Sequence, residues 1–156
     1  MKLCMIGTGY VGLVSGACFS DLGNKVICVD KNQNKINNLK KGIIPIYEPG
    51  LDEIVKRNFI NKRLSFSSDL NNSIKKSDII FICVGTPTKK SSSEADLSHV
   101  MNVANSVSKL IKTYKIIITK STVPVTTGDY IEKIISKKVS KKLFDVVSNP
   151  EFLREG

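Results

Sequence analysis

The sequence predicts an α/β fold, a doubly wound and mostly parallel sheet with helices on both faces. Short apolar runs alternate with segments of helical spacing along the whole chain, as expected when each helix leads back to the next parallel strand. The run from residue 78 to residue 84 is almost continuously apolar, which indicates a strand covered on both faces. A glycine-rich turn joins the first apolar run to the first helical segment.

The expected elements follow from these patterns in chain order. Asp69 is a candidate N-cap for the helix that begins at Leu70. The loop 43–50 holds two prolines, and the polar segment 89–94 is expected to be mobile. Strands are expected over residues 2–6, 25–29, 64–67, 78–84, 115–119 and 144–148, and helices over 10–22, 32–40, 51–57, 70–76, 95–111 and 127–138.

The glycine-rich turn has the spacing of a dinucleotide-binding motif. Gly7 permits a tight turn, Gly9 lets the backbone approach a pyrophosphate, and Gly12 lets the helix pack closely on the sheet. The helix N-terminus then offers amides and a positive dipole end to the phosphates. Asp30 ends the next strand, 18 residues after Gly12, where an acid accepts hydrogen bonds from the ribose and repels a 2′-phosphate. The motif predicts a Rossmann-type domain that binds NAD rather than NADP, although Lys31 could meet a phosphate.

Size and charge narrow the possible functions. The 156 residues suffice for one domain, and the net charge of +10 raises the question of nucleic-acid binding. However, 21 of the 24 basic residues are lysine, scattered among helices and turns without interleaved aromatic side chains. We therefore expect no nucleic-acid partner. No apolar run approaches the roughly 20 residues of a membrane span. The N-terminus is already a core strand, so we expect a cytoplasmic protein without a membrane partner.

The cysteines and the single histidine do not indicate a metal site. Cys4, Cys28 and Cys83 fall in apolar strands and Cys18 falls in the first helix, with none spaced as a C-x-x-C pair. We expect four buried, reduced thiols that act as small apolar side chains. His99 has no acidic or cysteine partner near it in the sequence, so we expect neither a catalytic role for it nor a bound metal.

Three more segments leave strands at the edge of the sheet where the glycine turn lies. They are residues 85–88, 120–124 and 149–155, and they carry hydroxyl groups, prolines or carboxylates. With the glycine turn and Pro45–Leu51, they resemble the UDP-glucose/GDP-mannose dehydrogenase family along the whole chain. The resemblance implies a four-electron oxidation of a sugar C6 alcohol to a carboxylate, using two NAD and a cysteine that forms a thiohemiacetal and then a thioester. The matching stretches read GTGYVG, PIYEPGL, VGTPT, KSTVP and SNPEFLREG.

The resemblance also implies roles for single residues. Thr122 corresponds to a threonine that positions a catalytic water, and Glu151 to a carboxylate that assists as general base. Without the family, Thr122 could instead cap the next helix, Glu151 could be a surface acid, and Thr86 could merely end a turn. Lys120 is expected to border this site rather than to work in it. The nucleotide sugar would meet Glu151, Phe152, Leu153, Arg154 and Glu155, and NAD would contact Gly7, Gly9, Tyr10, Val11, Gly12, Asp30, Lys35, Thr86, Thr122 and Glu155.

The resemblance covers only part of such an enzyme. Residues 1–156 form the N-terminal NAD-binding domain, without the catalytic cysteine, the central dimerisation helix or the second, nucleotide-sugar domain of the family. We therefore expect a domain that binds NAD but does not complete the reaction alone. For the full-length form we expect a homodimer that oxidises UDP-glucose to UDP-glucuronate, with UDP-N-acetylmannosamine or GDP-mannose as alternative substrates. A non-catalytic NAD-binding module is the alternative from another class.

Overall fold

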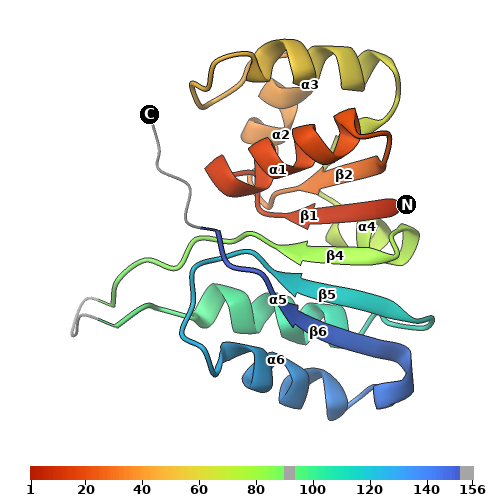
Figure 1. The fold of residues 1–156 in the computed structure, drawn as a ribbon, viewed down its shortest axis with the longest axis vertical. Coiled ribbons are helices and arrows are strands. Elements are labelled where there is room, and N and C mark those ends of the chain that lie inside the picture. The colour runs from red at the N-terminus through yellow and green to blue at the C-terminus, as the bar shows by residue number, and fades with distance from the viewer. Residues whose placement is uncertain (90–93, 152–156) are drawn as a thin grey trace.

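The computed structural model of the protein describes residues 1–89 and 94–151 (Figure 1). The segment 89–94 is expected to be mobile, but its residues 90–93 lie outside the described residues, and only Lys89 and Glu94 are described. These two residues approach each other, because the Lys89 Nζ lies 2.7 Å from an oxygen of the Glu94 carboxylate.

A six-stranded sheet forms the centre of the molecule, with the strand order β3-β2-β1-β4-β5-β6. All neighbouring strands pair in parallel, and the order reverses direction between β1 and β4, as in dinucleotide-binding domains. The predicted fold class is therefore confirmed. The strands are β1 (Lys2–Ile6), β2 (Lys25–Val29), β3 (Leu64–Ser67), β4 (Ile79–Ile82), β5 (Lys115–Thr119) and β6 (Phe144–Ser148).

Helices cover both faces of the sheet. Side chains along each strand point alternately to opposite sides, and in β1 the apolar side chains of both sides are buried in a core. In β1, Leu3 and Met5 pack in one core with helices α1 (Tyr10–Asp21), α2 (Gln33–Lys40) and α3 (Leu51–Ile60). Cys4 and Ile6 pack in the other core with α4 (Leu70–Lys76), α5 (Ser98–Ser108) and α6 (Thr127–Ser136). Figure 1 shows the carboxyl ends of the strands on one side of the molecule, where the loops after β4, β5 and β6 also lie.

The ends of several elements differ from the predicted ones. Helix α5 begins at Ser98 rather than at residue 95, because the Asp96 carboxylate accepts the Ser98 amide hydrogen and Ala95 pairs with Thr88 in an antiparallel bridge. Strand β4 is shorter than expected, and α3 continues three residues further than expected, to Ile60. A short 3-10 helix, η1 (Lys141–Leu143), was not predicted.

The prediction of four buried thiols is wrong for one cysteine. Cys4, Cys28 and Cys83 are buried, whereas Cys18 is exposed. The cause is the packing of α1, which presents Gly16 and Ala17 to the sheet and turns Cys18 toward solvent. Gly16 is needed there, because a Cβ at this position would lie 2.6 Å from the Cys28 sulfur.

Candidate functional site

The glycine turn between β1 and α1 has the backbone geometry that its sequence predicts. Gly7 has a φ of +103°, and a Cβ there would lie 2.6 Å from the carbonyl oxygen of Cys83. A Cβ on Gly12 would lie 1.9 Å from the carbonyl oxygen of Gly7, so the first turn of α1 sits directly against the turn. Gly9 has open space where its Cβ would be, and the N-terminus of α1 has no side-chain cap. This geometry leaves room for a phosphate group.

Asp30 lies beside the glycine turn and is bound to it. Its Oδ2 accepts hydrogen bonds from the Thr8 amide at 3.1 Å and the Thr8 hydroxyl at 2.7 Å, and its Oδ1 accepts one from the Asn32 amide at 3.0 Å. The Lys35 Nζ lies 3.5 Å from Oδ2. A carboxylate offers about four acceptor positions. Asp30 therefore keeps capacity for a ribose hydroxyl, chiefly at Oδ1.

The protonation of Asp30 suits this role. Burial acts to raise the pKa of its carboxyl, but the hydrogen bonds from Asn32 and Thr8 and the charge of Lys35 together outweigh burial and hold the pKa below its ordinary value. The side chain is therefore an anion at neutral pH. An anion in this position accepts ribose hydroxyl groups and disfavours a 2′-phosphate.

A cleft of about 500 Å³ opens at this edge of the sheet. Its volume falls within the range of small-molecule and cofactor sites. Four predicted cofactor residues line it, namely Gly7, Gly9, Asp30 and Lys35. The remaining lining comes from the ends of β1, β2 and β4, from Ser68 and Leu70, and from one face of α5, and comprises Ile6, Val29, Lys31, Ser68, Leu70, Cys83, Val84, Gly85, His99, Asn102, Val103 and Ser106.

One face of α5 lines the cleft, which the sequence did not predict. His99, Asn102, Val103 and Ser106 all line the cleft, and the His99 Nδ1 lies 3.3 Å from the carbonyl oxygen of Gly85. Positions separated by three, four and seven residues share one side of a helix, so the spacing alone could have placed these side chains together. What the sequence did not show is that this side faces Asp30 across the cleft.

The loops after β4, β5 and β6 meet at the same edge of the sheet. The Thr86 hydroxyl donates to the carbonyl oxygen of Thr122 at 3.1 Å, and the Thr122 hydroxyl donates to the carbonyl oxygen of Glu151 at 2.9 Å. The structure thus brings together Thr86, Thr122 and Glu151, although they are not among the residues that line the cleft. Thr122 does not cap α6, whose N-cap is Thr126.

Glu151 is also joined to Lys120. The Lys120 Nζ lies 2.9 Å from Glu151 Oε2 and 3.1 Å from Asn149 Oδ1, with only 10% of the lysine side chain exposed. Glu151 is therefore not an unpaired surface acid. The other predicted substrate residues, Phe152, Leu153, Arg154 and Glu155, lie outside the described residues.

A pair of side chains joins the segment Pro45–Leu51 to the start of α1, directly after the glycine turn. The Tyr10 hydroxyl, at the start of α1, donates to the carboxylate of Glu48. This contact places the stretch PIYEPGL beside the first turn of α1, close to where Val11 and Gly12 lie in the chain.

Cys83 is the thiol that lines the cleft. Burial raises its pKa to about 12, and the opposing effect of the Lys120 charge is smaller. The thiol is therefore neutral at pH 7 and unsuited to act as a nucleophile. Among residues 1–89 and 94–151, no group of three or more histidine, cysteine or acidic side chains could hold a metal ion. No helix in the same residues is long and apolar enough to span a membrane.

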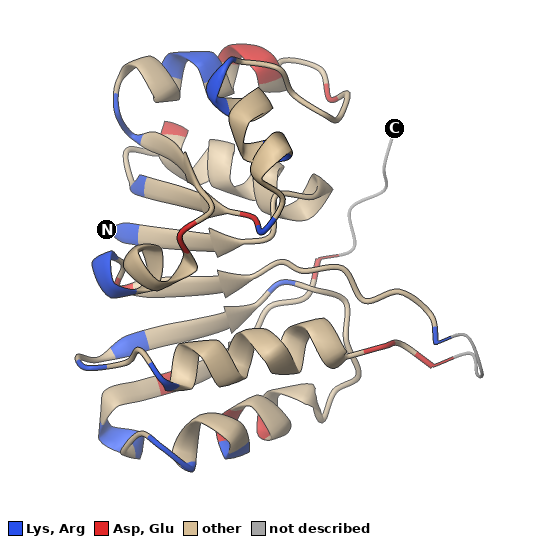
Figure 2. Cartoon of the chain, turned by 180° about the vertical axis from the view of Figure 1, so that it is seen from behind, with Lys and Arg blue, Asp and Glu red and all other residues tan. Residues whose placement is uncertain are grey.

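Basic residues gather at the opposite edge of the sheet, where the strands begin (Figure 2). A hollow of about 520 Å³ there is bordered by one acid, Asp78. Lysines in the last turn of α4 complement its dipole, and the buried Lys115 Nζ donates to the carbonyl oxygen of Ser77. Lys75, Lys76 and Lys115 therefore have structural contacts, and we assign no ligand to the basic residues of this hollow. These basic residues are Lys2, Lys25, Lys62, Arg63, Lys75, Lys76 and Lys115.

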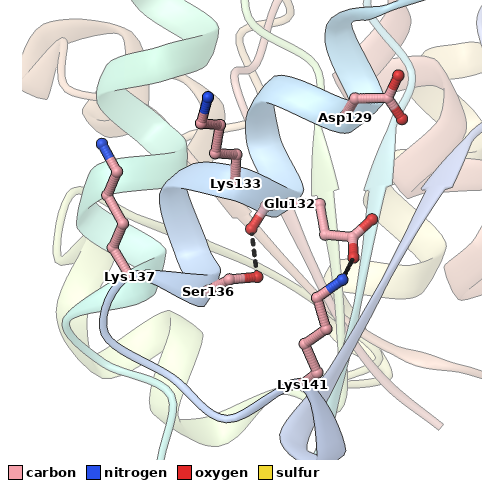
Figure 3. Close-up of a pocket in the computed structure, with 6 residues that line it drawn as sticks. All are labelled: Asp129, Glu132, Lys133, Ser136, Lys137 and Lys141. Atoms are coloured by element: carbon pink, nitrogen blue, oxygen red, sulfur yellow. Dashed lines mark hydrogen bonds and ion pairs between the residues drawn. The ribbon is translucent and has the colours of Figure 1, made fainter.

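Another hollow of about 520 Å³ lies on the outer face of α6 (Figure 3). Its side chains interact with one another, since Lys141 pairs with the Glu132 carboxylate and the Ser136 hydroxyl donates to the Glu132 carbonyl oxygen at 2.7 Å. It is a solvated helix face far in sequence from the glycine turn, and we assign it no function.

The strand order, the glycine turn and the cleft with Asp30 define a dinucleotide-binding domain. A sequence model described as "UDP-glucose/GDP-mannose dehydrogenase family, NAD binding domain" matches residues 1–156. The chain belongs to this family and is its NAD-binding domain, so the resemblance and the NAD cofactor predicted from the sequence are confirmed.

Several known proteins are similar to this chain. UDP-glucose 6-dehydrogenase TuaD of Bacillus subtilis is 53% identical over 99% of the chain and 34% of its own length. UDP-glucose 6-dehydrogenase of Rhizobium meliloti is 52% identical over all of the chain and 36% of its own length. The structure of a UDP-glucose dehydrogenase from Pyrobaculum islandicum has a TM-score of 0.92 at 36% identity, and covers 99% of this chain and 37% of that one. The chain thus spans about a third of these relatives.

Proposed function

We propose that this chain supplies the NAD-binding domain of a UDP-glucose 6-dehydrogenase, which oxidises UDP-glucose to UDP-glucuronate. One observation carries the proposal. The Asp30 cleft and the cluster of Thr86, Thr122 and Glu151 lie at the same edge of the sheet, so a cofactor site shares this edge with a carboxylate suited to proton transfer. The identity of 53% to a UDP-glucose 6-dehydrogenase supports the choice of substrate.

The described residues fit NAD. The open space at Gly9 and the uncapped start of α1 would receive the pyrophosphate, with Tyr10, Val11 and Gly12 forming the first helical turn beneath it. Asp30 and Lys35 would hold the adenosine ribose. When bound, NAD would accept the hydride removed from the sugar.

Thr122 and Glu151 would act on the substrate side. We assign Thr122 to the positioning of a water molecule and Glu151 to proton transfer as a general base. The hydrogen bond from the Thr122 hydroxyl to the Glu151 carbonyl oxygen supports this assignment, because it keeps the two residues adjacent. Thr86 and Glu155 as NAD contacts, and residues 151–155 as substrate contacts, rest on the family resemblance.

Two related nucleotide sugars are alternative substrates. A GDP-mannose dehydrogenase from Pseudomonas aeruginosa has a TM-score of 0.92 at 36% identity, and a UDP-N-acetyl-mannosamine dehydrogenase from Staphylococcus aureus has one of 0.89 at 31% identity. The match covers 37% of the first of these chains and 38% of the second. The full-length form, which we propose to be a cytoplasmic homodimer that serves polysaccharide biosynthesis, is the form to assay.

The test is NADH formation by the full-length protein with each of the three nucleotide sugars. We expect the value of kcat/KM to be highest for UDP-glucose, with two NADH formed per sugar. A higher kcat/KM for GDP-mannose or UDP-N-acetylmannosamine would make that nucleotide sugar the substrate in place of UDP-glucose. Binding of NAD without turnover of any of the three would instead indicate a non-catalytic NAD-binding module.

A further inference from the structure

We propose that Lys120 is a positioning residue for Glu151, which it holds in place and keeps ionised for proton transfer. The inference rests on the proposed function, because the role of Glu151 as a base belongs to it. It changes the expectation from the sequence that Lys120 only borders the site.

The position of Lys120 is fixed by the sheet. It follows the last residue of β5, its amide donates to the Ile82 carbonyl oxygen at 2.9 Å, and its own carbonyl oxygen accepts the Glu151 amide hydrogen at 3.1 Å. The side chain is 10% exposed and that of Glu151 is 25% exposed. The ammonium group therefore meets the carboxylate largely away from water.

The side-chain contacts do more than connect the loops. The segment after β6 is already attached by the backbone hydrogen bonds from Asn149 to Thr119 and from Glu151 to Lys120. The ion pair at 2.9 Å and the hydrogen bond to Asn149 Oδ1 at 3.1 Å add to these bonds. Their specific effect falls on the Glu151 carboxylate. The hydrogen bond to Asn149 helps to hold the Lys120 ammonium group against Glu151 Oε2.

The charge of Lys120 favours the ionised form of this carboxylate. Partial burial favours the protonated form of an acid, whereas an adjacent cation favours the anion, and a general base must be an anion. Cys83, which feels the Lys120 charge, is a neutral thiol, and Asn149 and Thr122, which hydrogen-bond to Lys120 and to the Glu151 carbonyl oxygen, do not titrate. Without Lys120, Glu151 would take up a proton at a higher pH than before.

An NMR titration of the Glu151 carboxyl carbon in the 156-residue chain tests the inference directly. In Lys120→Met and Lys120→Gln we expect the titration midpoint to rise by about one to three pH units. In Lys120→Arg, which keeps the charge, it should stay near that of the unaltered chain. Lys141→Met, which removes a lysine from an exposed ion pair on η1 and α6, is the matched control and should not move it. The amide spectrum shows whether each variant is folded. An unchanged midpoint in both folded neutral variants would overturn the inference.

The rate of UDP-glucose oxidation by the full-length protein provides a second test. Lys120→Met should move the acidic limb of the pH–rate profile to higher pH, and Lys120→Arg should restore it. In Glu151→Gln the same substitution should have little further effect, because two residues that act as a unit are not additive. A pH-independent loss, equal in both backgrounds, would contradict a positioning role. If the unaltered protein does not oxidise UDP-glucose, the proposed function fails, and the NMR titration still decides whether Lys120 controls Glu151.

Discussion

At the residue scale, Asp30 links the glycine turn to the cleft. Its carboxylate holds Thr8 through the amide and the hydroxyl and still faces the space that a ribose would occupy. The sequence predicted this acid from its distance to Gly12, because the motif is local and its spacing follows from one strand, one helix and one more strand. Its bonds to Thr8 and Asn32 were not predicted.

The lowered pKa of Asp30 predicts a pH dependence of stability. A carboxyl whose pKa is lower in the folded than in the unfolded state contributes stability above the unfolded value, and this contribution is lost as the pH falls through the folded value. Asp30→Asn should therefore be less stable than the unaltered chain at pH 7. Its unfolding temperature should fall less steeply below about pH 4. Thermal unfolding followed by circular dichroism between pH 7 and pH 3 measures this, and parallel curves would contradict it.

Lys120 illustrates what could not be predicted at this scale. It lies beside Ser121 and Thr122 in the sequence, but its partners Asn149 and Glu151 come after another helix and strand. Nothing local indicates which acid a lysine will meet across such a separation. The order of the parallel strands places β5 beside β6 and so decides the contact.

At the element scale, the first turn of α1 is the most constrained part of the site. Gly12→Ala would place a Cβ 1.9 Å from the Gly7 carbonyl oxygen, where backbone rather than a flexible side chain would have to move. We expect a loss of at least about 2 kcal/mol in the free energy of unfolding, together with loss of NAD binding. Chemical denaturation and a binding titration measure the two effects.

Gly128→Ala is the control for this substitution. It lies near the start of α6, and no atom lies within 4 Å of the position of its Cβ. We expect its effect on stability to stay within about 1 kcal/mol, because alanine favours helices more than glycine does. An equal loss of stability in both variants would show that the close packing of α1 is not the cause.

Helices and strands were predicted well where apolar residues repeat, and less well at their ends. Asp69 caps α4 as expected, its side chain accepting the Asn72 amide hydrogen. The start of α5 was placed too early, because Asp96 binds the Ser98 amide and the bridge between Thr88 and Ala95 keeps the chain extended. Side chains that compete for backbone amides decide such boundaries, and the apolar pattern does not report them.

At the scale of the whole molecule, the two edges of the sheet differ in character. The carboxyl edge holds the cleft, Asp30 and the joined loops after β4, β5 and β6, as predicted from the rule for open parallel sheets. The amino edge gathers basic side chains that looked scattered in the sequence (Figure 2). Parallel strands bring distant lysines together there. The face of α5 at the cleft was missed for the same reason, because its partner elements are distant in the chain.

We propose that this cleft binds NAD and selects it through Asp30. Isothermal titration of the 156-residue chain with NAD and with NADP, for the unaltered protein and for Asp30→Ala, tests it most directly. Hydrogen bonds to a charged group contribute about 1.5–3 kcal/mol, so we expect NAD to bind the unaltered chain at least about tenfold more tightly than Asp30→Ala. NADP should bind the unaltered chain more weakly than NAD, and the variant should lose this preference. No measurable NAD binding, or equal affinity for NAD in the two proteins, would contradict the claim.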